Sequence, residues 1–187
     1  KAEHGFGMRV TAANKPSKLT KVAPARIAIW DTYGGSMPSG WLRFIMEQYH
    51  FDAKVIYAPD IDAGDLKSKY DVIVFVGGSI PAYVANPTEN NNAGRQNFGT
   101  PALESIPEEY RTRVGRVSQD KSIPEIKKFL EAGGQVVTIG SATNLAAHLQ
   151  LPVSNAIVET VGGVEKRLPS TKYYVPGSVL SVSVGKN

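Results

Sequence analysis

From residue 26 onward, short apolar runs alternate with amphipathic segments. Residues 26–31 (RIAIWD) form an apolar run rich in β-forming residues, and a glycine-containing stretch separates it from residues 41–50 (WLRFIMEQYH), in which apolar side chains recur at helical spacing. This pattern predicts a strand, a turn and a helix. Ser39 is predicted to cap the helix N-terminus, because its hydroxyl can accept hydrogen bonds from the first free amides.

The same alternation continues through the middle of the chain. Further strands are predicted at 53–58 (AKVIYA), 71–78 (DVIVFVGG) and 135–140 (QVVTIG), and helical or turn segments at 62–70, 123–134 and 141–149. The run at 71–78 is apolar almost throughout, which is typical of a central strand covered on both faces. Alternating strands and helices predict right-handed βαβ crossovers and a three-layer, flavodoxin-like α/β domain on a parallel sheet.

Two segments depart from this alternation. Residues 11–24 are polar, contain two prolines and show no period, so residues 1–25 are interpreted as a basic linker or leader and residues 26–187 as the α/β domain. Residues 79–118 form a long irregular insertion, for which disorder or packing elaboration is favoured over a functional lid. After this insertion the alternation resumes, but it weakens beyond Leu151, where one late strand is predicted at 177–184.

Composition is that of one globular domain, with 187 residues, of which 42% are hydrophobic and 20% charged. No apolar stretch is long enough to span a bilayer and the first residues contain no apolar signal-peptide core, so no membrane partner is expected. The net charge of +4 divides into +5 for residues 1–26 and −1 for the remainder. Because no aromatic residue lies among the basic residues from Arg9 to Arg26, a solvated tail is favoured over nucleic-acid binding.

The chain contains no cysteine, which removes disulfides, thiolate metal ligands and a cysteine nucleophile together. The remaining nucleophile candidate is Ser141, at the predicted turn from strand to helix. Such a serine is a nucleophile when a base removes its proton, and it can equally cap the following helix by accepting from amides two or three residues on. The cap is favoured, because the sequence IGSATN lacks the second glycine of a GxSxG elbow.

None of the three histidines is well placed to act as a base for Ser141. His148 follows it by seven residues in the same predicted helix, about 10 Å along the axis at 1.5 Å per residue, which is too far for a hydrogen bond. His50 closes the first predicted helix, where a cation suits the negative end of the helix dipole. His4 lies in the leader.

Glycines and polar residues at the predicted strand ends indicate a possible ligand crevice, since open α/β sheets bind ligands at the carboxyl ends of their strands. Asp31 lies at its floor, and the amides of Gly77 and Gly78 can bind an anion, although paired glycines more often form a tight turn. The candidate ligand residues are Asp31, Gly34, Gly35, Gly77, Gly78, Ser79 and Ser141.

Other motifs carry less weight. Neither GxGxxG nor GxxxxGK[ST] occurs at the glycine loops, so no nucleotide cofactor is expected. Arg111, Arg113 and Arg116 lie close together, and a solvated run is favoured over a site for a small anion or an acidic surface. The aromatic residues interpreted as packing residues, with an interface role as the alternative, are Trp30, Trp41, Tyr173 and Tyr174.

Several blocks that occur in order resemble a known family. They are residues 27–49 (IAIWDTYGGSMPSGWLRFIMEQY), 57–78 (YAPDIDAGDLKSKYDVIVFVGG), 106–115 (IPEEYRTRVG), 127–149 (KKFLEAGGQVVTIGSATNLAAHL) and 173–184 (YYVPGSVLSVSV). From about residue 26 to 184, the chain resembles the class I glutamine amidotransferase-like domain attached C-terminally to certain bacterial zinc carboxypeptidases of the M14 type. The resemblance implies a flavodoxin-like fold, a secreted or periplasmic parent enzyme, and the peptidase domain of that parent as a partner.

The resemblance also exposes departures from the family. Class I amidotransferases place a nucleophilic cysteine where Ser141 stands, use a histidine held by a glutamate as base, and collect the oxyanion on a glycine loop that corresponds to Gly77 and Gly78. The late region that corresponds to the family's base reads LPSTKYYVPGS, without histidine. No histidine has glutamate three residues on, so the HxxE zinc motif is missing and no metal is expected.

These observations favour a non-catalytic accessory domain that serves as an interaction or small-ligand module, with a carboxylate or amino acid as ligand and homo-oligomers possible. The alternative is a small serine hydrolase that uses Ser141 and the Gly77 and Gly78 amides. A third reading is a ligand sensor with its crevice above Asp31, Gly78 and Ser141. Because the chain does not begin with Met, and similar domains continue past its last predicted strand, a piece of a longer protein is expected.

Overall fold

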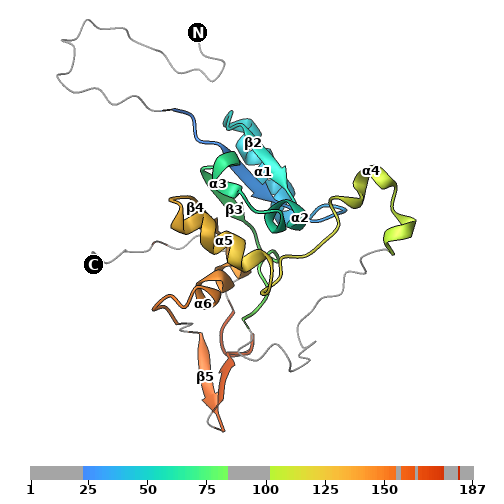
Figure 1. Ribbon diagram of the computed structural model, residues 1–187. Coiled ribbons are helices and arrows are strands. Elements are labelled where there is room, and N and C mark those ends of the chain that lie inside the picture. Colours follow the sequence, from blue (N-terminus) through green and yellow to red (C-terminus); the bar gives the residue numbers. More distant parts are fainter. Residues whose placement is uncertain (1–22, 84–101, 155–156, 163, 175–180, 182–187) are drawn as a thin grey trace, which may run out of the picture.

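The computed structural model describes residues 23–83, 102–154, 157–162, 164–174 and 181 (Figure 1). Within this part of the chain, four strands form a parallel sheet in the order β2-β1-β3-β4. The strands are β1 (Ile27–Trp30), β2 (Ala53–Ile56), β3 (Val72–Phe75) and β4 (Gln135–Thr138). The predicted α/β fold on a parallel sheet is therefore confirmed.

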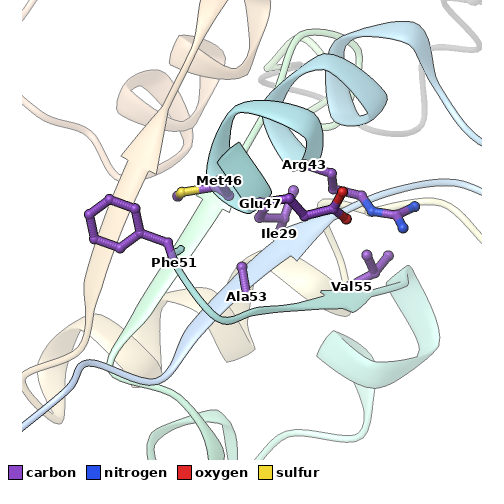
Figure 2. Close-up of a pocket in the computed structure, with 7 residues that line it drawn as sticks. All are labelled: Ile29, Arg43, Met46, Glu47, Phe51, Ala53 and Val55. Carbon is purple, nitrogen blue, oxygen red and sulfur yellow. The ribbon is translucent and has the colours of Figure 1, made fainter. Parts of the chain in front are cut away.

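Helices join these strands. α1 (Met37–Gln48) connects β1 to β2, α2 (Ala58–Asp62) and α3 (Leu66–Lys69) connect β2 to β3, and α5 (Ser122–Glu131) leads into β4. α2 and α3 both contact α5, so these three helices share one face of the sheet. α1 lies on the opposite face, where Figure 2 shows its side chains above β1 and β2.

The main hydrophobic core fills the space between the sheet and the layer of α2, α3 and α5. Successive side chains of a strand point to opposite faces, so Ala28 and Trp30 enter this core while Ile29 points toward α1. The core includes Ala28, Trp30, Ile56, Ile61, Leu66, Ile73, Phe75, Ile126 and Phe129. Burial of Trp30 agrees with its predicted packing role.

The α1 face of the sheet is covered unevenly. Val55, Ile29, Val74 and Val137 stand side by side across the four strands, so all four point to this face. Ile29 is 0% and Val74 4% exposed, whereas Val137 on β4 is 47% exposed. In the described part of the chain, α1 covers the centre of the sheet and leaves β4 bare on this side.

The N-terminus of α1 differs from the prediction. Ser36, not Ser39, is the N-cap: its side chain accepts a hydrogen bond from the Ser39 amide at 3.3 Å. Pro38 then occupies the first helical turn, where its missing N–H costs nothing. Ser39 is fully buried inside the helix, and its hydroxyl has no hydrogen-bond partner among the described residues.

The remaining elements are short. The described part of the predicted insertion 79–118 contains η1 (Leu103–Ser105) and α4 (Glu108–Arg111). The predicted helix after β4 is divided into η2 (Gly140–Asn144) and α6 (Leu145–His148). β5 (Val158–Val161) and β6 (Val164–Arg167) form an antiparallel hairpin that the weak pattern beyond Leu151 did not predict.

The late strand predicted at 177–184 lies outside the described residues, except for Ser181, and so does most of the leader at 1–25.

The C-terminus of α5 bears out the prediction that a glycine pair ends this helix. Gly133, with a φ of 82°, donates its amide to Leu130 O, and Gly134 donates to Phe129 O, the two hydrogen bonds of a Schellman motif. Gly134 also lies against the buried Phe129 ring, so closely that a Cβ atom at this position would overlap the ring. Position 134 therefore requires glycine.

We predict that Gly134→Ala destabilises the fold by about 1–3 kcal/mol, because the Phe129 ring cannot move away within a filled core. Chemical denaturation measures the change. Gly40→Ala is the matched control: Gly40 lies in α1 with open space around its Cβ position, so alanine there raises stability by up to about 1 kcal/mol. Equal effects of the two substitutions would contradict the close approach to Phe129.

An ion-pair network ties the start of β1 to the start of β3. Asp71 accepts hydrogen bonds from the Arg26 side chain and backbone, and Lys67 Nζ lies 3.1 Å from its Oδ1. The Arg26 guanidinium, then the Arg26 amide and Lys67, hold the pKa of Asp71 well below its ordinary value of 3.8. The network lies at the amino ends of the strands, opposite the edge that carries the candidate ligand residues.

We predict that Asp71→Asn lowers the melting temperature at pH 7 and that this difference disappears in acid. The pKa of Asp71 is lower in the folded than in the unfolded chain, so its contribution is complete above pH 3.8 and is lost as the pH falls further toward the folded-state pKa. Melting curves from pH 7 to pH 2 measure the difference. Asp52→Asn, which removes an exposed acid just before β2, is the control for loss of a surface charge.

Candidate ligand-binding crevice

The loop after β1 is organised by the Asp31 carboxylate. Its Oδ1 accepts the amides of Thr32 at 2.8 Å and Ser36 at 2.9 Å, so the acid links the end of the strand to the cap of α1. Gly34 and Gly35 have φ angles of 85° and 79°, a conformation that glycine adopts without strain. Asp31 itself is only 5% exposed.

This loop forms one wall of an open crevice of about 380 Å³ at the carboxyl ends of β1 and β2. Three predicted ligand residues, Asp31, Gly34 and Gly35, line it. The other residues that line it are Thr32, Tyr33, Arg43, Tyr57, Tyr110 and Arg113. The structure thus adds a set of cationic and aromatic side chains to the predicted glycine loop.

Arg113 is held in the crevice by two aromatic rings. Its guanidinium carbon lies 4.8 Å from the centroid of the Tyr110 ring and 5.7 Å from that of Tyr57. Neither Arg113 nor Arg43 makes a side-chain hydrogen bond or ion pair with any other described residue. In Figure 2, Arg43 extends from α1 on the side where β2 ends, away from Phe51.

The three neighbouring arginines have separate environments. Arg111 donates from Nε to the Ile106 carbonyl at 2.9 Å, and Arg116 does not line the crevice. Arg113 alone of the three does so. All three arginines are exposed, as a solvated run would be, and a small-anion role for Arg113 stays a prediction.

The other predicted ligand residues form a second group, at the ends of β3 and β4. Ser79 donates both its amide and its hydroxyl to Val76 O, which closes a turn over Gly77 and Gly78. The Gly78 amide donates to Ser141 Oγ at 2.9 Å. Neither η2 nor α6 has a side-chain cap, so the predicted cap role of Ser141 is wrong. The Ser141 hydroxyl instead accepts the Gly78 amide, which belongs to the loop after β3.

Two more side chains continue this connection. Asn144 Nδ2 donates to Ile80 O at 3.3 Å, and His148 Nε2 lies 2.9 Å from Pro81 O. Ser141, Asn144 and His148 follow one another at intervals of three and four residues, a spacing that places side chains on one side of a helical segment. We call these three residues the loop clamp. They fasten the segment after β3 to the segment after β4.

Two of the three histidines, His50 and His148, lie in the described part of the chain. His148 Nδ1 is buried without a partner in the described structure, its Nε2 contacts Pro81, and its ring packs edge-on against Tyr83 at 5.4 Å. His50 follows α1 and precedes β2, so it lies at the amino ends of the strands, across the sheet from Ser141. His4 lies outside the described residues.

A separate feature is an apolar surface on α1 and β4, which we call the α1–β4 surface. α1 presents an outward stripe in which Trp41 and Phe44 stack edge to face at 6.1 Å. The surface comprises Met37, Trp41, Phe44, Ile45 and Tyr49 around α1, with Val137 and Ile139 at β4. Trp41 is 63% exposed and Tyr173 and Tyr174 are also exposed, so their predicted packing role within the domain is wrong.

Comparison of the chain with protein-family models, with curated proteins and with solved structures finds no match in any of the three. Among the described residues there is no cluster of three or more histidine, aspartate or glutamate side chains that could hold a metal ion. No helix in that part of the chain is long and apolar enough to cross a membrane.

Proposed function

We propose that this chain is a non-catalytic accessory domain of flavodoxin-like, amidotransferase-like ancestry, which serves as a binding module beside the zinc carboxypeptidase domain of a longer, secreted or periplasmic protein. The strand order β2-β1-β3-β4 supports this ancestry, because it matches the first four strands of flavodoxin-like sheets. The observation that carries the proposal is the hydrogen bond from the Gly78 amide to Ser141 Oγ.

In that hydrogen bond, the serine-hydrolase candidate nucleophile and the candidate oxyanion donor are engaged with each other. An oxyanion hole requires amides aimed at the position of the developing oxyanion, whereas the Gly78 amide is directed at the serine oxygen itself. A serine nucleophile also requires a base within hydrogen-bond reach. His148 is engaged by Pro81 and Tyr83 and is part of the loop clamp. These contacts support a structural role for the loop clamp, which fastens the segments after β3 and β4.

We predict that the chain does not hydrolyse activated esters or amides, and that Ser141→Ala leaves any background rate unchanged while lowering stability by about 0.5–1.5 kcal/mol through loss of the Gly78 hydrogen bond. Release of p-nitrophenol and chemical denaturation measure the two quantities. Ser170→Ala, at an exposed turn, is the control. A turnover that Ser141→Ala abolishes would establish the serine-hydrolase alternative.

The α1–β4 surface supports the accessory role. It gathers large apolar side chains on a helix whose inner side already packs on the sheet. Several large exposed apolar side chains gathered on one element often mark a site of association. We assign it to the peptidase domain of the parent protein, because an accessory domain needs a stable contact with the domain it serves.

We predict that Trp41→Ser weakens binding to an M14-type peptidase domain, supplied as a separate protein, by about thirtyfold, since a central tryptophan commonly contributes about 2 kcal/mol or more. Calorimetry measures the affinity, and sedimentation tests self-association in parallel. Leu151→Ser removes an exposed apolar side chain outside the surface and leaves the affinity unchanged. Absence of binding by the unmodified chain would contradict the assignment, as would a self-association that Trp41→Ser abolishes.

A further inference from the structure

The crevice at the ends of β1 and β2 carries both signs of charge. Asp31 is a buried carboxylate at its floor, while Arg43 and Arg113 contribute guanidinium groups with no ionic partner among the described residues. Asp31 would repel a simple anion in this crevice, and the two arginines would repel a simple cation. A ligand that carries a carboxylate and an ammonium group together is complementary to all three side chains.

Arg113 is suited to bind the carboxylate. The Tyr57 and Tyr110 rings restrict its guanidinium, so less conformational entropy is lost when a ligand binds. The planar guanidinium presents paired N–H donors that match a carboxylate in two parallel hydrogen bonds. Arg43, which enters from α1, adds a second positive charge to the same crevice.

Asp31 is suited to bind the ammonium group. Both of its hydrogen bonds are accepted by Oδ1, and Oδ2 has no hydrogen-bond donor among the described residues. A carboxylate that is 95% buried gains from a charge-assisted partner for its remaining oxygen. Gly35 lies beside this oxygen, since a Cβ atom at its position would be 4.0 Å from Oδ2.

The size of the crevice limits the ligand. About 380 Å³ is near the lower end of the range for small-molecule sites, so a single amino acid fits this volume better than a dinucleotide. Tyr57 and Tyr110 provide ring surface for its side chain.

We infer that this crevice binds a free α-amino acid, with Arg113 and Arg43 holding the carboxylate and Asp31 the ammonium group. The inference rests on the proposed function of a non-catalytic binding module and names its ligand class. The residues involved are distinct from the loop clamp, so the site is separate from the position of an amidotransferase nucleophile.

The test is a thermal-shift screen of the common L-amino acids, followed by calorimetry on the one that gives the largest shift. N-acetylation of that amino acid removes its positive charge, and conversion to the amide removes the carboxylate. We expect each change to weaken binding to the unmodified chain at least tenfold. Inorganic phosphate is the probe for a general anion site and is expected to compete poorly.

Arg113→Gln is expected to weaken binding of the same amino acid at least tenfold, whereas Lys127→Gln, at an exposed position of α5 that does not line the crevice, leaves it unchanged. Asp31→Asn tests the ammonium contact, and the N-acetyl analogue replaces this test if the variant fails to fold. Equal binding of the N-acetyl analogue, or of phosphate, would overturn the inference. Absence of binding across the panel would also overturn it, while the esterase result would still decide whether the domain is catalytic.

Discussion

β1 pairs with β2 on one side and with β3 on the other. The chain therefore builds the sheet first toward the β2 edge and then, from β3 onward, toward the β4 edge. α1 returns along one face, and α2, α3 and α5 occupy the other. The loop after β1 therefore emerges where neighbouring connections diverge, and open α/β sheets form ligand crevices at such points. The position of Asp31 follows from this pairing, as does the space in front of it.

The other end of the sheet stabilises the same pairing. Arg26 and Asp71 join the amino ends of β1 and β3, while the loop clamp joins the segments that follow β3 and β4. The central strands are thus held at both edges by hydrogen bonds that do not depend on apolar packing. This arrangement gives Ser141 a structural contact at the position where the resembled family has its nucleophile, and His148 takes part in the same connection.

Sequence patterns predicted those parts of the structure that are determined by residues close together in the sequence. The four strands of the parallel sheet, the end of α5 at Gly133 and the exit of β1 at Asp31 were predicted, because burial periodicity and glycine turns are local properties. The true cap of α1 had a local signal too: Pro38 belongs in a first turn, which indicates Ser36 rather than Ser39.

The missed features have partners far away in the sequence. Ser141 meets Gly78 from 63 residues away, so no helix-capping rule could identify its contact. Tyr57 directly follows the end of β2. The rule that ligands bind at the carboxyl ends of parallel strands, which selected Asp31, could also have identified Tyr57. Tyr110 enters the crevice from the insertion, and only the folded chain shows that Arg113 lies between the two rings.

α1 connects the two proposed surfaces. Its first turn is anchored to Asp31 through Ser36, its middle carries Arg43 into the crevice, and its outer stripe carries Trp41 and Phe44. The core on its side of the sheet is the thinner one, since Val137 is uncovered there. A partner that buries the outer stripe would therefore restrain the helix that positions Arg43. Restraint at one surface lowers the entropy lost on binding at the other, so the two binding events would reinforce each other through this single helix.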